Sequence, residues 1–394
     1  MSKILLFHRD KAGNDTLNCF TELLGKALNR KGIETKVFDI EPYGTGRMPD
    51  GEVLYKEIVN ASFDAAIAFN SVGQEKYNID GKNVFDMAGF PFINYIVDHP
   101  LDHFFSLTNV PKEYYVICMD REHVDFIKSV IPEVRDAFFL PLGGVVDESG
   151  IKEKKYDVVF TASLLDRNVI EQKILEMSGT LQKITLDTID YLLFNRDASV
   201  EEGLLSVLED KGLHCDNAND YLAYSFATKE IYKYLRSYYR EECVRYIMQS
   251  DVELHIFGGG WERIISDNSS KVIIHDTIPY YDTARLTSES KVLLNIMPLF
   301  KDGSHDRIAT AMLNGAAVLT DHSKYLDENY SEYLDFFDIN HPEDIPNQID
   351  YIIKHYDEHQ FKIESAKKYA HRYMSWDCVA ERIIDICNMM RLWR

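Results

Sequence analysis

Short apolar runs alternate with amphipathic segments along the first 140 residues of the chain. Between residues 15 and 31, Leu17, Phe20, Leu24 and Leu28 recur at helical spacing, and Gly32 follows where such a helix would end. The pattern predicts strands at 3–8, 36–40, 64–69, 92–97, 114–119 and 137–140, and further helices at 53–60 and 121–130. Strands that alternate with helices favour a parallel sheet with helices on both faces.

The second half of the chain resumes this alternation after an interruption. A boundary is expected at 141–144, followed by a charged linker at 147–155 and a strand from 156. Residues from about 166 to 250 contain no proline and keep helical spacing, so we predict a helical insertion there, with its tyrosines at 232–246 as packing residues. Later strands are predicted at 253–257, 271–275, 291–296, 316–320 and 333–339, a helix at 305–313, and a helical tail in which Trp376 and Trp393 pack. We therefore expect an α/β protein with an N-terminal domain over 1–150 and a C-terminal domain over 151–375.

Composition supports two domains and narrows the classes of partner. A chain of 394 residues exceeds one ordinary core. Its net charge of −21, without a Lys/Arg block, argues against nucleic acid as a partner. The first apolar run, 4–7, is shorter than a signal-peptide core, and no run approaches the roughly 18 apolar residues that span a membrane. The six cysteines are scattered without a CxxC pair, so we expect a reduced cytoplasmic protein without a zinc site.

The most informative segment for chemistry is 291–322, in which a buried strand leads through a Gly-Ser loop into a helix. Ser304 is the predicted N-cap of that helix, and His305 and Arg307 lie in its first turn. A helix N-terminus with free N–H groups binds anions, and an arginine beside it favours a diphosphate. The alternative is an ordinary capped helix with a surface arginine.

Two further segments place small or basic residues after predicted strands. Gly258 and Gly259, in the run that follows the strand at 253–257, allow either a close approach to a ligand or a tight turn. The run lacks a complete GxGxxG, so a nicotinamide site is not supported. After the strand at 156–161, Thr161, Ser163 and Arg167 can reach a phosphate, although a capped helix start explains them equally well.

Two loops of the first half carry candidate acid–base groups. Asp98 and His99 follow the strand at 92–97, where ligands bind in open α/β sheets, and can act as general base and orienting group. The alternative is a polar turn before a proline, and the loose spacing of the acidic and histidine residues disfavours a metal site. In the first strand-to-helix loop, His8, Arg9 and Asp10 leave the strand and Gly13 bends the chain, as in many such turns.

These motifs together resemble a known family. They are YDVVFTAS at 156–163, FGGGW at 257–261, SKVLLNI at 290–296, GSHDRIATAMLNGAAVLTD at 303–321 and AKKYAHRYMSWDCVAERI at 366–383, with VDHP at 97–100 and LPLGG at 140–144 matching more faintly. The chain resembles the two-domain GT-B glycosyltransferases and, more narrowly, the spore maturation CgeB-like glycosyltransferases.

The resemblance implies a GT-B architecture, in which two Rossmann-like domains face a cleft and the last helix, at 376–394, packs back on the N-terminal domain. A nucleotide-diphosphate sugar would be held by the second domain and the acceptor by the first. By position, His305 and Arg307 would contact the diphosphate, and Gly258 and Gly259 would lie near the nucleotide. Many GT-B enzymes carry a ribose-binding glutamate where this chain has Thr310, so ribose recognition would fall to another residue such as Asp302 or Asp306.

The mechanism implied is metal-independent sugar transfer with no cofactor besides the nucleotide sugar. The helix dipole and Arg307, helped by Arg167, would stabilise the leaving diphosphate, while Asp98 or His99 would activate an acceptor hydroxyl. The acceptor is expected to be a protein or a cell-surface glycan, which the helical insertion would help to bind. Two alternatives stay open: a sugar-nucleotide epimerase of the same fold, and a non-catalytic sugar-nucleotide-binding or scaffold protein.

Overall fold

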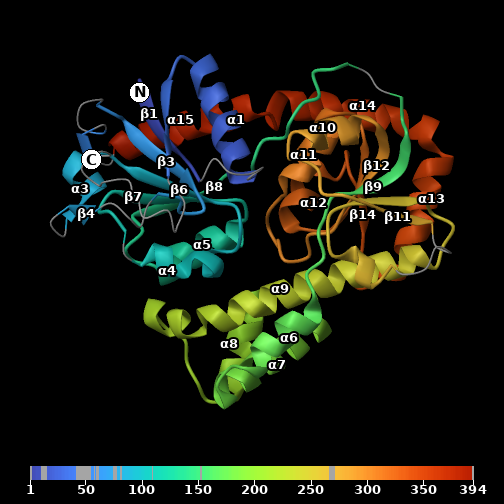
Figure 1. Ribbon diagram of the computed structural model, residues 1–394, viewed down its shortest axis with the longest axis horizontal. Coiled ribbons are helices and arrows are strands. Elements are labelled where there is room, and N and C mark those ends of the chain that lie inside the picture. The colour runs from blue at the N-terminus through green and yellow to red at the C-terminus, as the bar shows by residue number, and fades with distance from the viewer. Residues whose placement is uncertain are drawn as a thin grey trace. The chain divides into compact units, whose positions relative to one another are not determined.

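The computed structural model divides into two compact units (Figure 1). It describes residues 2–9, 16–40, 55–56, 58, 62–73, 78–79, 82–108, 110–150, 153–265 and 271–392. The first unit comprises residues 1–143 together with 376–394, and the second comprises 144–375. Each unit is built on one six-stranded sheet.

The sheet of the first unit is parallel throughout. In spatial order its strands are β2 (Glu34–Asp39), β1 (Lys3–His8), β3 (Ala65–Phe69), β6 (Phe92–Ile96), β7 (Tyr114–Cys118) and β8 (Asp136–Phe139). The central strands β3, β6 and β7 are buried at every position, because helices and loops cover both faces of a parallel sheet. Their continuous apolar runs are the signal that predicted them.

The remaining elements of the first unit are short, apart from its two long helices, α1 and α15. They are α1 (Thr16–Arg30), the hairpin β4 (Asn78–Ile79) and β5 (Lys82–Asn83), α3 (Val84–Ala88), η1 (Pro100–His103), α4 (Phe104–Leu107), α5 (Arg121–Val130) and α15 (Trp376–Leu392). Helix α15 packs on α1, with the Trp376 ring 5.9 Å from that of Phe20. Most of the helix predicted at 53–60 lies outside the described residues, and so does Trp393.

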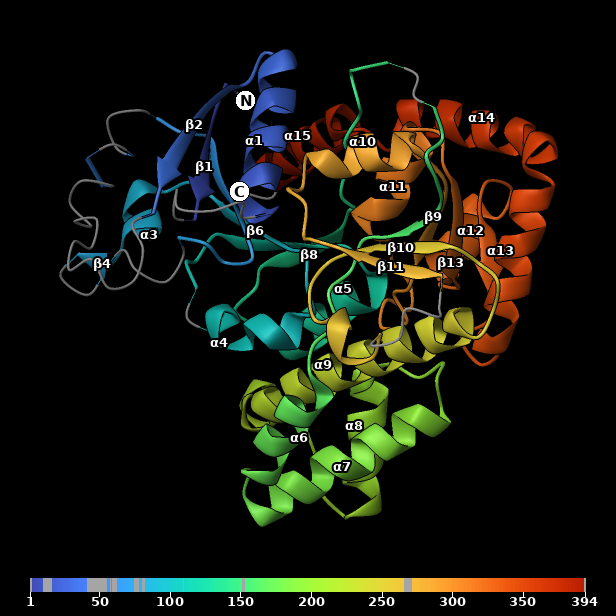
Figure 2. The same ribbon diagram turned by 45° about the vertical axis from the view of Figure 1, so that its right-hand side comes forward.

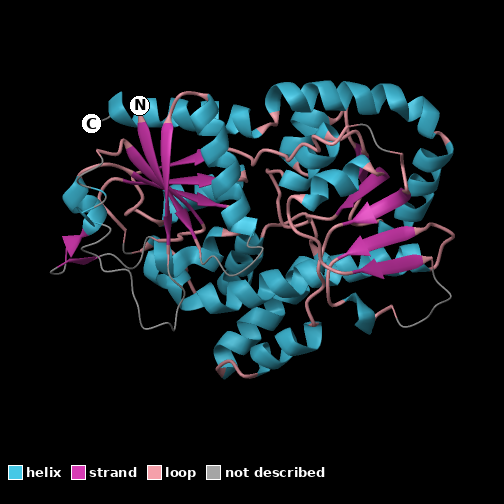
Figure 3. Ribbon diagram, turned by 45° about the horizontal axis from the view of Figure 1, so that its top comes forward, coloured by secondary structure: helices cyan, strands magenta, loops and turns pink. Residues whose placement is uncertain are grey.

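The sheet of the second unit is also parallel, and Figure 3 shows its strands in magenta. In spatial order they are β11 (Val272–His275), β10 (Leu254–Phe257), β9 (Tyr156–Phe160), β12 (Ser290–Asn295), β13 (Ala317–Asp321) and β14 (Asp335–Phe337). Counted along the chain this is the order 3-2-1-4-5-6 of the doubly wound dinucleotide-binding fold. In that fold ligands bind at the carboxyl ends of the strands beside the order reversal, which lies between β9 and β12.

Helices cover both faces of this second sheet. They are α6 (Arg167–Leu175), α7 (Gly179–Phe194), α8 (Val200–Asp210), α9 (Ala218–Met248), η2 (Trp261–Arg263), α10 (Asp282–Ser288), α11 (Asp306–Leu313), α12 (Lys324–Tyr330), η3 (Pro342–Asp344), α13 (Ile345–Lys354) and α14 (Tyr356–Tyr373). Helix α9 runs along one side of the sheet, and α6, α7 and α8 contact α9 (Figure 2). The stretch predicted to be helical is thus four helices, of which α9 joins the sheet core.

The tyrosines of α9 pack as predicted. Tyr232 and Tyr239 are buried, and the Tyr239 hydroxyl donates to the carbonyl of Leu192 on α7. None of the described helices is long and apolar enough to cross a membrane.

The segment that enters the second unit is fastened to α11. Gly144 pairs with Ser375, the last residue of this unit, and its N–H donates to the carbonyl of Met374. A Cβ on Gly144 would lie 2.5 Å from the backbone nitrogen of Thr310, so only glycine allows this contact with the helix. Gly144, where the chain enters this unit, therefore lies on α11 and beside Ser375, where the chain leaves it.

Candidate functional site

The candidate anion site of the second unit is built on the N-terminus of α11. The helix begins at Asp306, and its N-cap is His305, whose Nδ1 accepts from the Arg307 N–H at 3.4 Å. The prediction that Ser304 caps this helix is therefore wrong by one residue. Ser304 is instead a buried residue that precedes the cap.

The first turn of α11 holds a compact set of charged groups. Arg307 donates from Nη1 to the carbonyl of Thr161 at 3.1 Å, and this contact ties α11 to the end of β9. Buried Asp306 accepts from the Tyr280 hydroxyl at 2.7 Å, and its Oδ1 lies 2.6 Å from His305 Nδ1. Although burial favours a neutral carboxyl, His305, Tyr280 and Arg307 together lower the pKa of Asp306, so it is ionised at neutral pH.

Burial and the positive charge of Arg307 lower the pKa of His305. The imidazole is therefore neutral at pH 7. Its Nδ1 lies within reach of both Asp306 and the Arg307 Nε, at 3.2 Å from the latter, so the tautomer decides which of them it bonds. The positive charge of this turn comes from Arg307.

Sequence reasoning missed two arginines that approach the same place from α9. Arg240 donates from Nη1 to the carbonyl of Ser163 at 2.9 Å, in the loop whose Thr161 carbonyl accepts from Arg307. Burial and the charges of Arg307 and Arg236 lower the pKa of Arg240 well below its ordinary value. The signal for this cluster was the spacing of Arg236 and Arg240, four residues apart and so on one helical face.

Buried polar atoms mark the carboxyl ends of the strands below this cluster. Thr161 Oγ1, Asn295 Oδ1 and Asp321 Oδ2 follow or end β9, β12 and β13, and each lacks a hydrogen-bond partner within the described part of the chain. Burial raises the pKa of Asp321 to about 6, although the positive charges of Lys301 and Arg307 lower it. Buried polar atoms are normally satisfied, so unpaired atoms at a ligand-binding edge indicate a functional region.

The glycines after β10 are explained by packing. A Cβ on Gly258 would lie 2.3 Å from the carbonyl oxygen of Ala162, and one on Gly260 would lie 2.0 Å from that of Leu164. Both glycines therefore let the turn pack against the backbone of the loop that follows β9. Gly259 differs, because a Cβ there meets nothing within 4 Å, and its carbonyl accepts from the Leu164 N–H. The nucleotide-binding role of Gly258 and Gly259 stays a prediction.

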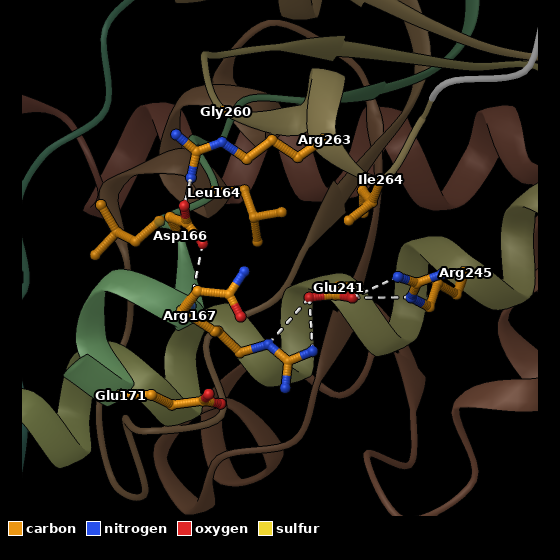
Figure 4. Close-up of a pocket in the computed structure, with 11 residues that line it drawn as sticks. Leu164, Asp166, Arg167, Glu171, Glu241, Arg245, Gly260, Arg263 and Ile264 are labelled. Atoms are coloured by element: carbon orange, nitrogen blue, oxygen red, sulfur yellow. Dashed lines mark hydrogen bonds and ion pairs between the residues drawn. The ribbon is translucent and has the colours of Figure 1, made fainter. Parts of the chain in front are cut away.

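Arg167 lies in a different pocket from the α11 site. It opens α6 and pairs with Glu241 at 2.9 Å, and Glu241 also binds Arg245 (Figure 4). The pocket has a volume of about 250 Å³, and Arg263 and Asp166 form a further ion pair in it. Each of these arginines has a carboxylate partner, so the arrangement explains Arg167 as an inter-helix link.

Thr310 and Asn314 hold the entering segment rather than facing the strand ends. The buried Thr310 Oγ1 accepts from the Val145 N–H at 3.1 Å. Asn314 accepts from the Asp147 N–H at 2.7 Å and donates to the Val145 carbonyl at 2.8 Å. Asp302, the other candidate for ribose binding, is buried and lies 3.8 Å from Lys324.

In the first unit, Asp98 is the more accessible of the two predicted acid–base groups. Its side chain is 49% exposed, and its Oδ2 accepts from Asn70 Nδ2 at 2.8 Å and lies 3.8 Å from His103 Nε2. Asn70 and Ser71 adopt left-handed conformations, with φ of 48° and 61°, and Asn70 Oδ1 also accepts from the Val97 N–H. Such strain in non-glycine residues is typical of functional sites.

His99 is placed differently. It is 3% exposed, its Nδ1 accepts from the Leu101 N–H at 3.2 Å, and its ring packs edge-on against His123. This is the arrangement of the polar turn that the sequence left open. At the end of β1, His8 Nδ1 lies 3.1 Å from Asp39, whereas Asp10 and Gly13 lie outside the described residues. No group of three or more metal-ligating side chains occurs in the described ranges.

Comparison with known proteins points to one fold. Residues 236–385, which include α11 and the arginines Arg236 and Arg240 of α9, match the family model described as glycosyl transferase-like. Sucrose-phosphate synthase from Thermosynechococcus elongatus is similar, with a TM-score of 0.54, 10% identity and full coverage of both chains. The fold is that of the GT-B glycosyltransferases. This confirms the predicted fold class of two Rossmann-like domains, whereas their placement about a cleft stays a prediction.

Two other solved structures share the GT-B fold with this chain. A glycosyltransferase from Rickettsia africae gives a TM-score of 0.55 at 8% identity, with 99% of this chain and 98% of that one covered. BGT of phage T4, in complex with its substrate UDP-glucose, gives 0.51 at 13% identity, with 98% and 100% covered. No curated protein matches the sequence. The narrower CgeB-like resemblance stays a prediction.

Proposed function

We propose that this protein is a glycosyltransferase that moves a sugar from a nucleoside-diphosphate donor to an acceptor hydroxyl. The observation that carries the proposal is Arg307, a cation in the first turn of α11 at the carboxyl edge of the second sheet, tied there to the end of β9. The glycosyl transferase-like match over 236–385 covers this turn, and one structural neighbour is bound to UDP-glucose.

In the proposed reaction the acceptor oxygen attacks the anomeric carbon, and the bond from that carbon to the diphosphate oxygen breaks. The first-turn N–H groups of α11 and the Arg307 guanidinium stabilise the negative charge that develops on the leaving diphosphate. Asp98 takes the proton of the acceptor hydroxyl, and Asn70 holds its carboxylate in place. We propose His99 as a supporting residue, because its ring is buried beside Asp98.

The proposal also covers the metal dependence of the reaction, the class of acceptor and the residues that contact the donor. Fixed cations at the leaving group take the part that a divalent metal plays in other transferases, so we propose metal-independent transfer with no further cofactor. The acceptor is proposed to be a protein or a surface glycan, and the protein to be a CgeB-like hexosyltransferase of the cytoplasm. Gly259, Ser304, His305 and Thr161 are proposed as donor contacts beside Arg307.

The proposal is tested by thermal shift of the full chain with UDP, GDP, dTDP, ADP and CMP and their common sugar conjugates. A ligand that binds only the folded state raises the melting temperature. We expect one nucleoside diphosphate to do so, and Arg307→Ala to remove most of the shift, because a charge-assisted contact worth about 1.5–3 kcal/mol is lost. Arg285→Ala, which removes an exposed arginine of α10, is the matched control and should keep the shift.

A second candidate function is a non-catalytic sugar-nucleotide-binding protein. Thr310, which stands where many GT-B enzymes carry a ribose-binding glutamate, is committed to the Val145 backbone. Binding of a sugar nucleotide without any release of nucleoside diphosphate, across a panel of glycan and protein acceptors, would favour this candidate over the transferase.

A further inference from the structure

The loop that follows β9 is held by arginines from two distant parts of the chain. Arg307 of α11 donates to the carbonyl of Thr161 at 3.1 Å, and Arg240 of α9 donates to that of Ser163 at 2.9 Å. One residue, Ala162, separates these carbonyls along the loop. The helical insertion therefore places a guanidinium close to the one on which the proposed donor site rests.

Arg240 differs from Arg167, Arg196 and Arg245 of the insertion in having no counter-ion among the described residues. Arg167 and Arg245 pair with Glu241, and Arg196 forms two hydrogen bonds with Glu242. Arg240 makes no ion pair with any carboxylate in the described ranges, and its Nε is buried without a hydrogen-bond partner. Arg240 is only half-buried, but its Nε is shielded from solvent with an unused donor. An unpaired buried donor is costly, so this arrangement favours an anion as its partner.

Arg236 adds to this excess of positive charge. It lies one turn before Arg240 on α9, with its guanidinium 6.0 Å from the Tyr232 ring. The positive charges of Arg236 and Arg307 each lower the pKa of Arg240, because they disfavour a third positive charge nearby. The three arginines therefore lie in one region. The nearby carboxylate of Asp306 is already engaged with Tyr280 and His305.

We propose that Arg240, supported by Arg236, binds the diphosphate of the donor together with Arg307, so that the helical insertion completes the donor site. The inference deepens the proposed function and rests on it. A diphosphate carries two adjacent anionic groups, and guanidinium groups from two elements can contact both of them. The insertion thus has a role on the donor side, in addition to any contact with an acceptor.

The test is isothermal titration of the full-length protein with inorganic pyrophosphate and, separately, with inorganic phosphate. We expect Arg240→Gln to weaken pyrophosphate binding about tenfold or more, as Arg307→Gln does, because each removes a charged contact. Arg240→Lys, which keeps the charge, should retain part of the affinity. Arg245→Gln is the matched control on the same helix, since Arg245 is paired with Glu241, and it should bind pyrophosphate like the unmodified protein.

A second measurement separates ligand binding from a purely structural role. If Arg240 only clamped the loop, Arg240→Gln would lower the melting temperature of the ligand-free protein and leave pyrophosphate affinity unchanged. If it binds the diphosphate, removing one of three neighbouring cations leaves that melting temperature unchanged or raises it, while affinity falls. Loss of affinity in Arg307→Gln alone overturns the role of Arg240 but keeps the proposed function. No pyrophosphate binding by the unmodified protein, with no nucleoside diphosphate bound either, overturns both.

Discussion

Asp321 shows how one buried residue links the site to stability. It ends β13 almost fully buried, with Oδ1 accepting from the Met297 N–H and Oδ2 unpaired among the described atoms. Burial raises its pKa from 3.8 to about 6. The folded state therefore binds a proton more tightly than the unfolded state, and this contribution to stability is lost as pH rises from about 4 to 6.

We predict that Asp321→Asn stabilises the protein at pH 7.5 and has a clearly smaller effect at pH 4.5. The amide keeps an oxygen for the Met297 N–H and removes the cost of burying a charge, on the order of 1–3 kcal/mol. Urea unfolding at the two pH values measures the difference. A destabilisation at pH 7.5 would instead indicate that the carboxylate is needed to balance Arg307 and Lys301.

The role of Asp98 as the proposed general base can be tested by a single substitution. We predict that Asp98→Asn lowers kcat for nucleoside-diphosphate release by about a hundredfold or more and leaves the KM for the donor unchanged, because a base acts on the acceptor proton. The assay uses the sugar nucleotide that stabilises the protein most, with glycan and protein acceptors offered. Asp125→Asn, an exposed position on α5, serves as control. An equal loss in both variants, or no loss in either, would remove Asp98 from the mechanism.

At the scale of elements, the strands were the most predictable part of the chain. Strands β3, β6, β7, β12 and β13 are apolar runs with almost every residue buried, and burial on both faces is what a parallel sheet imposes on sequence. The existence of these elements follows from local composition. Their bounds are less determined: the strand predicted at 333–339 is only Asp335–Phe337, and α11 begins one residue later than the Ser304 cap implied.

The candidate site was predicted only where its residues are adjacent in sequence. His305 and Arg307 share one helical turn, so the motif indicated them together. Arg240 lies far from Arg307 in sequence, and only the packing of α9 along the sheet brings its guanidinium to the same loop. For the same reason Arg167, which follows a strand in a promising motif, proved to be paired with Glu241 in a separate pocket.

Helix α11 combines two tasks that its sequence does not separate. Its first turn faces the carboxyl ends of the strands through Arg307, whereas Thr310 and Asn314 bind the backbone of residues 145–147. The GT-B pattern, in which a glutamate at this position binds the ribose, led to the expectation that residue 310 decides ribose binding. In this chain the residue has a structural use, because the entering segment passes so close that Gly144 can carry no side chain.

At the scale of the whole molecule, charge is distributed very unevenly. The chain carries a net charge of −21, yet three arginines gather at the edge of one sheet. A local positive site on an acidic protein attracts a small anion while the remaining surface repels polyanions such as nucleic acid. This distribution suits a nucleotide-sized ligand and agrees with the absence of a basic block in the sequence.

The last helix, α15, belongs to the first unit, and Trp376 is the residue with which its docking can be tested. Trp376 is 4% exposed, with its ring 5.9 Å from Phe20 of α1 and 6.4 Å from Phe69 of β3. Ion pairs of Arg30 with Asp377 and of Lys31 with Glu381 flank it on the surface. Exposed ion pairs contribute little, so the buried face of α15, which the Trp376 indole opens, supplies most of its docking energy.

We predict that Trp376→Ala destabilises the first unit by about 3–5 kcal/mol, the usual cost of deleting a buried aromatic side chain. Hydrogen exchange of the full-length variant should show faster exchange in α1, β3 and α15, while α9 and the strands of the second unit keep their protection, because the two units have separate cores. Phe361→Ala, which removes an aromatic ring that is 83% exposed on α14, is the control and should change neither. Equal loss of protection in both units would mean that they unfold as one cooperative body, and α15 would then stabilise the whole molecule rather than its own sheet.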